Sequence, residues 1–125
     1  NGGNQMKQEM DIKLYKFEII SGKEAVAEEW LNFLSSNRKA GEVLLKKERA
    51  YLEAYFTAVE YGNMYVYMFF ACEDEKFSVD KAINHGSDLD EKHFEYMKEC
   101  IDLTKGNIMD CLLYLDNMED AIKDH

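Results

Sequence analysis

The sequence has no proline, no excess of basic residues and no long hydrophobic run. Without proline, no residue forcibly breaks a helix or strand. No apolar stretch approaches the ~20 residues that a transmembrane helix needs. Lys and Arg number 15 against 25 Asp and Glu, which gives a net charge of −10. Such a chain repels phosphate backbones and anionic lipid, so we expect neither nucleic acid nor a membrane as a partner.

Motifs of metal, nucleotide and nucleophile sites are also missing. The three cysteines, at positions 72, 100 and 111, are odd in number and share no CxxC spacing. They predict free, buried thiols in a reducing compartment, and therefore a cytoplasmic protein. His85 and His93 match no metal-site spacing, and the glycines that follow residue 20 are isolated, so no phosphate-binding loop is present. We predict neither a bound metal nor a cofactor.

The length of 125 residues fits one domain. Residues 1–10 are polar and Gly-containing, and we expect a disordered leader or a remnant of cloning there. The domain is predicted over residues 11–116, followed by an acidic tail over 117–125.

The order of elements predicts the fold class. Residues 11–20, 51–61, 64–72 and 107–115 are rich in β-branched and aromatic side chains and predict four strands. Gly62-Asn63 favours a tight hairpin turn between the middle two. Apolar stripes predict one long helix after Ser21 with a bend near Ser36, and a second helix over 88–104, whereas residues 73–87 look irregular. The result is an α+β, ferredoxin-like β-α-β-β-α-β domain with a four-stranded antiparallel sheet and two helices on one face.

Both faces of this sheet are expected to be apolar. Alternation along each strand predicts an aliphatic face under the helices, formed by Leu52, Ala54, Phe56, Ala58, Met64, Val66, Met68, Phe70, Met109, Cys111, Leu113 and Leu115. The other face is expected to carry Tyr51, Glu53, Tyr55, Thr57, Tyr65, Tyr67, Phe69 and Asp110. An uncovered apolar face is a liability on a monomer, so we predict a two-fold homodimer through this tyrosine-rich face.

Three stretches carry a family resemblance: LYKFEIISGKEAVAEEWLNFLSSNR (Leu14–Arg38), YLEAYF (Tyr51–Phe56) and DLDEKHFEYMKECID (Asp88–Asp102). They resemble an uncharacterised bacterial family of the dimeric α/β barrel superfamily. The resemblance implies ferredoxin-like protomers whose sheets face each other, but no activity. Characterised members of the superfamily include cofactor-independent monooxygenases, haem-degrading enzymes, haem peroxidases and isomerases. The haem-degrading members use an Asn on the first strand and a Trp in the cavity; here the first strand has no Asn and Trp30 lies on the first helix.

A few polar residues on apolar faces are candidates for a site. His93 lies in the apolar stripe of the second helix, and it is either a structural histidine bonded to a backbone carbonyl or to Asp90, or an acid/base group at a cavity edge. Glu53 is a second hypothetical acid or base. The expected cavity lining is Tyr51, Tyr55, Tyr65, Tyr67 and Asp110, with a filled dimer interface as the alternative.

Three functions remain open at this stage. The first is a homodimeric domain that binds a small apolar or aromatic ligand in a tyrosine-lined cavity without catalysis. The second is a cofactor-independent monooxygenase- or isomerase-like enzyme with His93 or Glu53 as the base. The third is a structural dimer with a filled interior. The sequence does not decide whether the protein is an enzyme.

Overall fold

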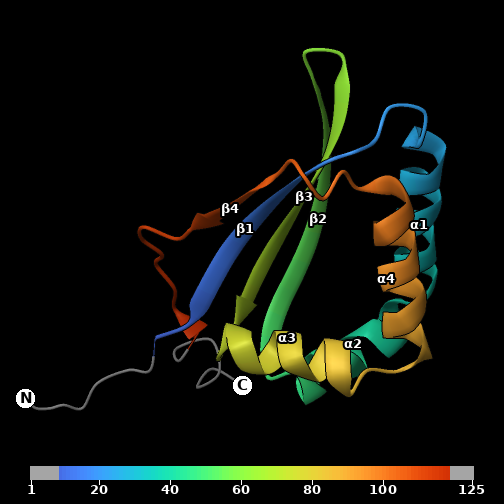
Figure 1. The fold of residues 1–125 in the computed structure, drawn as a ribbon. Helices are drawn as coiled ribbons and strands as arrows, with labels where there is room; N and C mark the ends of the chain where they lie inside the picture. The colour runs from blue at the N-terminus through green and yellow to red at the C-terminus, as the bar shows by residue number, and fades with distance from the viewer. Residues whose placement is uncertain (1–8, 119–125) are drawn as a thin grey trace, which may run out of the picture.

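The computed structural model describes residues 9–118 of the chain. Within them, four strands and four helices alternate in the order strand, two helices, two strands, two helices, strand (Figure 1). The strands are β1 (Asp11–Glu18), β2 (Ala50–Glu60), β3 (Asn63–Cys72) and β4 (Asn107–Asp110). The helices are α1 (Glu24–Ser36), α2 (Arg38–Lys47), α3 (Glu75–Asn84) and α4 (Asp88–Cys100). Most of the leader expected over 1–10 and of the tail expected over 117–125 lies outside the described residues.

The strands form one antiparallel sheet in the order β2-β3-β1-β4. This order is compatible with a ferredoxin-like fold, and the α+β class with a four-stranded antiparallel sheet is confirmed. The last strand is shorter than the expected 107–115, because β4 pairs with β1 only from Asn107 to Asp110. β4 therefore pairs only with the stretch of β1 from Lys13 to Lys16.

The helices differ from the predicted pair. The first helical stretch is interrupted at Asn37, close to the expected bend, and gives α1 and α2. Residues 73–87, expected to be irregular, contain α3, whose first turn is capped by Asp74 accepting from the backbone N–H of Phe77 at 3.2 Å. α1 and α4 lie side by side over one face of the sheet, while α2 and α3 lie across its end (Figure 1).

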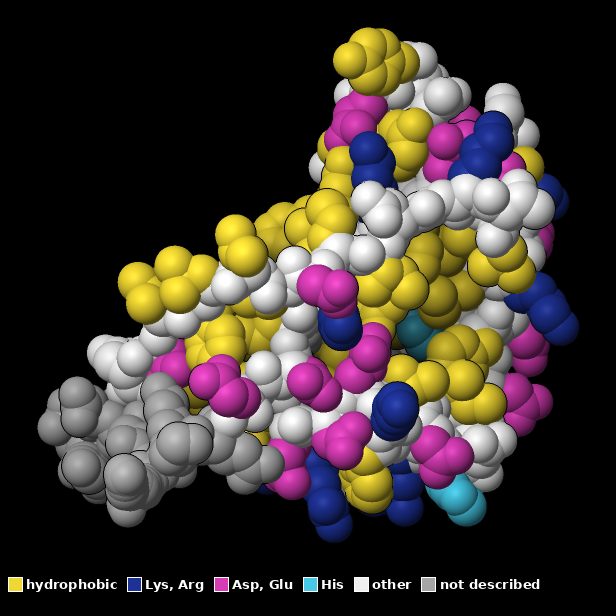
Figure 2. Space-filling view, turned by 60° about the vertical axis from the view of Figure 1, so that its left-hand side comes forward, with side chains coloured by type: hydrophobic (Ala, Val, Ile, Leu, Met, Phe, Trp, Pro, Cys, Tyr) yellow, Lys and Arg dark blue, Asp and Glu magenta, His cyan; other side chains and the backbone are white. Residues whose placement is uncertain are grey.

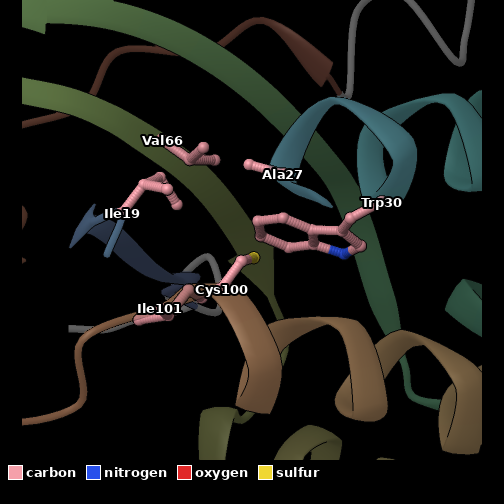
Figure 3. Packing of buried hydrophobic residues seen from close by; sticks show 6 residues of the cluster. All are labelled: Ile19, Ala27, Trp30, Val66, Cys100 and Ile101. Carbon is pink, nitrogen blue, oxygen red and sulfur yellow. The ribbon is translucent and has the colours of Figure 1, made fainter. Parts of the chain in front are cut away.

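The hydrophobic core lies between α1, α4 and the sheet. Its buried residues are Ile19, Ala27, Trp30, Val66, Cys100 and Ile101, whose side chains converge in Figure 3. Trp30 is fully buried and is the largest of them. Cys100 and Cys72 are buried as expected, whereas Cys111 is exposed, and all three thiols are free.

The register of the hairpin corrects the predicted composition of the two faces. Tyr61 and Gly62, with φ of 54° and 80°, form the turn, one residue earlier than expected. Glu60 therefore pairs with Asn63, so each odd-numbered residue of β2 from Glu53 onward opposes an even-numbered residue of β3. Neighbours across a sheet share a face, so even-numbered residues of the two strands cannot lie together.

The face under the helices is consequently mixed. Pairing places Glu53, Tyr55 and Thr57 of β2 beside Phe70, Met68 and Val66 of β3. The opposite, outer face carries Leu52, Ala54, Phe56 and Ala58 of β2, Tyr65, Tyr67, Phe69 and Ala71 of β3, Ile12, Leu14, Lys16 and Glu18 of β1, and Met109 of β4. The predicted tyrosine face is thus divided between the two sides of the sheet.

Candidate functional site

A hydrogen-bonded acid and phenol lie on the helix-facing side of β2. The Tyr55 hydroxyl donates to Glu53 Oε2 at 2.5 Å, and both residues are partly buried. Burial raises the pKa of the Glu53 carboxyl, the charge of Asp90 raises it further, and the Tyr55 hydrogen bond opposes both. Burial also raises the pKa of Tyr55 well above its ordinary value. The pair therefore consists of a weakly acidic carboxyl that accepts a hydrogen bond from a neutral phenol.

His93 projects from α4 to the same region and is held by Trp30 of α1. The Trp30 indole Nε1–H donates to His93 Nδ1 at 2.8 Å, so the proton of the neutral imidazole lies on Nε2. Burial lowers the pKa of His93 to about 4. At neutral pH this ring is a hydrogen-bond donor through Nε2 and not a base at Nδ1.

The two pairs are in contact through aromatic rings. The Trp30 ring lies edge-on to the Tyr55 ring, with centroids 5.8 Å apart, and 5.7 Å from the His93 ring. β2, α1 and α4 thus bring Glu53, Tyr55, Trp30 and His93 into one constellation. The expected partners of His93 were a backbone carbonyl or Asp90, and the structure gives Trp30 instead.

Glu48 is a component that sequence reasoning missed. Glu48 directly follows α2, and only 8% of the residue is exposed. The Ser78 hydroxyl of α3 donates to the backbone carbonyl oxygen of Glu48 at 2.6 Å. Its carboxyl has no hydrogen bond or ion pair among the described residues. Burial, together with the charges of Asp90 and Glu53, raises the pKa of Glu48 to about 7. The sequence gives no signal for this burial, because it depends on α3, which was not predicted.

Asp90 is the third acid of the group and lies at the start of α4. Its Oδ2 accepts from the backbone N–H of Ser87 at 3.1 Å, and Ser87 Oγ accepts from the Asp90 N–H, which together form a capping box. Asp90 is 8% exposed, and the capping box satisfies its carboxylate. Its negative charge acts on both Glu48 and Glu53. No ion pair involving any of the three acids is found within residues 9–118.

The molecule is hollowed between the sheet and the helices. Figure 2 shows hydrophobic side chains in the walls of this recess, acidic and basic side chains at its rim, and a histidine side chain at its floor. In the described part of the chain, no three His, Cys, Asp or Glu side chains lie close enough together to hold a metal ion. The walls of the recess are therefore hydrophobic, and charged side chains surround its opening.

The remaining predicted site residues lie elsewhere. Tyr65 and Tyr67 are on the outer face, where Tyr65 OH donates to Glu18 Oε1 at 3.1 Å and Tyr67 OH donates to Glu60. Tyr51 lies at an irregularity in the β2–β3 pairing and is exposed. Asp110 pairs with Lys13 on the β4 edge. The structure thus brings together His93, Glu53 and Tyr55, and separates the other four from them.

Comparisons with known proteins show the family but no activity. The chain is similar to a solved structure described as a conserved protein from Methanosarcina mazei Go1, with 22% identity over 82% of this chain and 90% of that one, and a TM-score of 0.55. That likeness supports the fold alone. No curated protein matches. No helix in the described residues is long and apolar enough to cross a membrane. Residues 10–120 match a family of unknown function, DUF6176, and the chain belongs to that family.

Proposed function

We propose that this protein binds a small ligand with an apolar or aromatic body in the recess between the helix-facing side of the sheet and α4. The observation that carries the proposal is the convergence of the Glu53–Tyr55 pair and the Trp30–His93 pair through the Trp30–Tyr55 ring contact, in a molecule that is hollowed between the sheet and the helices (Figure 2). Rings give such a site contact area, and a few fixed polar groups orient the ligand. The cavity is therefore lined by Tyr55 but not by Tyr65 or Tyr67.

The single tryptophan provides the test, because the chain has one indole N–H and that group donates to His93. A set of indole, catechol and 2-phenylethanol is titrated into 15N-labelled protein. We expect one or more of them to shift the Trp30 indole resonance, and Tyr55→Ala to weaken that binding. Tyr51→Ala, at an exposed tyrosine of the same strand, is the matched control. Compounds that leave the indole signal unmoved, or that shift only outer-face residues, would contradict the proposal.

Catalysis is a second candidate, because burial raises the pKa of Glu53 and so makes its carboxylate a stronger base. His93 is less suited to that role, since its Nδ1 accepts from Trp30. A bound compound that is converted by the wild type, and is bound but not converted by Glu53→Gln, would favour a cofactor-independent enzyme. Binding without turnover in both proteins would favour a binding domain.

The outer face supports a homodimer as the assembly. Leu52 and Phe56 are more than half exposed there, beside the apolar side chains of β1 and β3. The acids of this face are neutralised by Lys16 and Lys105, which pair with Glu60 and Glu18 at 3.0 and 3.2 Å. A second copy would therefore meet an apolar surface without local excess charge, despite the net charge of −10. Three free cysteines support a reducing, cytoplasmic setting for it.

Sedimentation tests this assembly with two substitutions on one strand. Phe56→Glu adds a charge to the outer face, and Val59→Glu adds one to the opposite side of β2, where Val59 is 74% exposed. We expect the wild type and Val59→Glu to be dimers at micromolar concentration and Phe56→Glu to be a monomer. A monomeric wild type would contradict the proposal that a second copy covers the outer face of the sheet.

A further inference from the structure

Glu48 is a buried carboxyl that nothing in the described residues satisfies. Its backbone is fixed on both sides, because its N–H donates to Leu44 O at 3.0 Å and its carbonyl accepts from Ser78 Oγ at 2.6 Å. The side chain is thereby held under the helices with 8% of the residue exposed. A buried carboxylate without a donor or a counter-ion is costly, so it is either protonated or matched by a cation.

The two cations adjacent to Glu48 in the sequence do not pair with it, since Lys47 is exposed and Arg49 is directed elsewhere. Arg49 follows Glu48 with a left-handed φ of 56°, and its guanidinium lies 4.4 Å from the Phe77 ring centroid and 3.8 Å from Glu73. The lysines within the described residues that form ion pairs all do so with acids outside the group of Glu48, Glu53 and Asp90. No cation of residues 9–118 pairs with Glu48, so its carboxyl is either protonated or matched by a cation from outside the described residues.

The surroundings of Glu48 indicate what kind of cation fits. Its charge is close to those of Asp90 on α4 and Glu53 on β2, and Glu53 is bonded to Tyr55, which contacts Trp30. The acids do not approach as a metal-binding group of three in the described part of the chain. Aromatic rings beside separated carboxylates instead suit an organic ammonium group, whose N–H groups donate hydrogen bonds to the carboxylates and whose charge is attracted to the ring faces.

We infer that the ligand of this recess carries a protonated amino group on its apolar body, and that the Glu48 carboxylate, with Glu53 beside it, is the counter-ion. This inference rests on the proposed function, since it names the chemical class of ligand for the same recess. It also explains why three acids lie together without a lysine or arginine among them.

Calorimetry with three related probes tests the inference: 2-phenylethylamine, 2-phenylethanol and 3-phenylpropionate, which share a ring and differ in charge. At pH 8 we expect the amine to bind about tenfold or more tightly than the alcohol, and the anion most weakly. Glu48→Gln should reduce the affinity for the amine to that for the alcohol. Glu42→Gln is the control, since Glu42 is an exposed acid of α2 paired with Arg38. If Glu48→Gln does not fold, Glu53→Gln should show a smaller loss of the same preference.

Proton release gives a second readout. The titratable groups that face Glu48 are Asp90 of α4 and Glu53 and Tyr55 of β2, while α3 contributes only the Ser78 hydroxyl. At pH 6.5, binding of the amine should release protons, seen as a dependence of the measured heat on the buffer, and Glu48→Gln should abolish most of that release.

The outcomes separate this inference from the proposed function. Binding of the alcohol at the Trp30 indole without a preference for the amine overturns the inference and leaves the recess as a ligand site. An amine affinity unchanged in Glu48→Gln also overturns it. If none of the three probes shifts the indole resonance, the inference is overturned, and the wider aromatic set described above decides the proposed function.

Discussion

The two sides of the sheet hold the same chemical pair in opposite electrostatic settings. On the helix-facing side, Tyr55 donates to Glu53, burial raises the pKa of that carboxyl, and no lysine joins the pair in the described structure. On the outer side, Tyr67 donates to Glu60, and Lys16 adds an ion pair at 3.0 Å, so that the tyrosine bond and the lysine lower the pKa of Glu60.

The difference shows where the fold leaves room for an external partner. The outer pair is complete, because its acid has both a hydrogen-bond donor and a counter-ion. The inner group, Glu48, Glu53 and Asp90, has three acids and one tyrosine donor but no counter-ion within residues 9–118. A structural role alone would favour the complete arrangement, since an unpaired buried carboxylate destabilises the folded state. The incomplete arrangement is the one on the helix-facing side of the sheet, where we propose the ligand site.

The largest effect on stability is expected from Trp30, because its side chain is part of the hydrophobic core and also donates to His93. Trp30→Ala removes a fully buried ring and should lower the free energy of unfolding by about 3–5 kcal/mol, measured by urea denaturation. Trp30→Phe keeps most of the packing but removes the donor to His93, so its cost should be smaller. Equal stability of the wild type and Trp30→Ala would contradict the core described here.

The pH dependence of stability should reveal Glu48. Its folded pKa of about 7 exceeds the ordinary value of 4.5, so the folded state binds more protons between these pH values than the unfolded state. Stability therefore falls as pH rises from about 4.5 to 7, by about 2 kcal/mol. Glu48→Gln should remove this fall and be the more stable protein at pH 8. Glu42→Gln should keep the wild-type dependence.

His93 should act in the opposite direction. Its folded pKa of about 4 lies below the ordinary 6.5, so the unfolded state binds more protons between these values. Stability then falls as pH drops from about 6.5 to 4, by about 2 kcal/mol, since the ring is not fully buried. His93→Gln should remove this fall in stability between pH 6.5 and pH 4, measured by urea denaturation. An imidazole proton signal that titrates near 6.5 and is lost in His93→Gln would contradict the burial of His93.

The smallest effect separates the two tyrosine–glutamate pairs. Tyr55→Phe leaves Glu53 without its donor and should cost about 1–2 kcal/mol, while raising the pKa of Glu53 further. Tyr67→Phe should cost less, because Glu60 keeps Lys16. Equal costs for the two substitutions would mean that the sides of the sheet do not differ as described.

Much of the fold follows from local patterns in the chain, and the errors are instructive. The strands, the hairpin and the break near Ser36 depend on residues that are close in sequence. α3 was missed because its apolar residues are sparse, although Asp74 before Glu75 is a common start of a helix. The predicted faces were wrong because the alternation was read along each strand separately. A two-residue turn pairs odd-numbered residues of one strand with even-numbered residues of the next, so the expected hairpin itself excluded a face made only of even-numbered residues.

The candidate site was less accessible to sequence reasoning. His93 and Glu53 were singled out as polar residues on apolar patterns, and both lie in the constellation. Trp30 and His93 are 63 positions apart, so nothing local predicts their hydrogen bond. Glu48 lies among lysines after a helix and reads as a solvated residue until α3 and α4 are placed over it.

Carboxyl 13C NMR of the glutamates, recorded as a function of pH with Glu48→Gln and Glu60→Gln for assignment, tests the contrast most directly. We expect Glu48 to titrate near pH 7 and Glu60 to titrate below its ordinary range. Titration of both carboxyls near 4.5 would show that Glu48 is solvated or paired, and would contradict the unsatisfied acid on which the inner site depends.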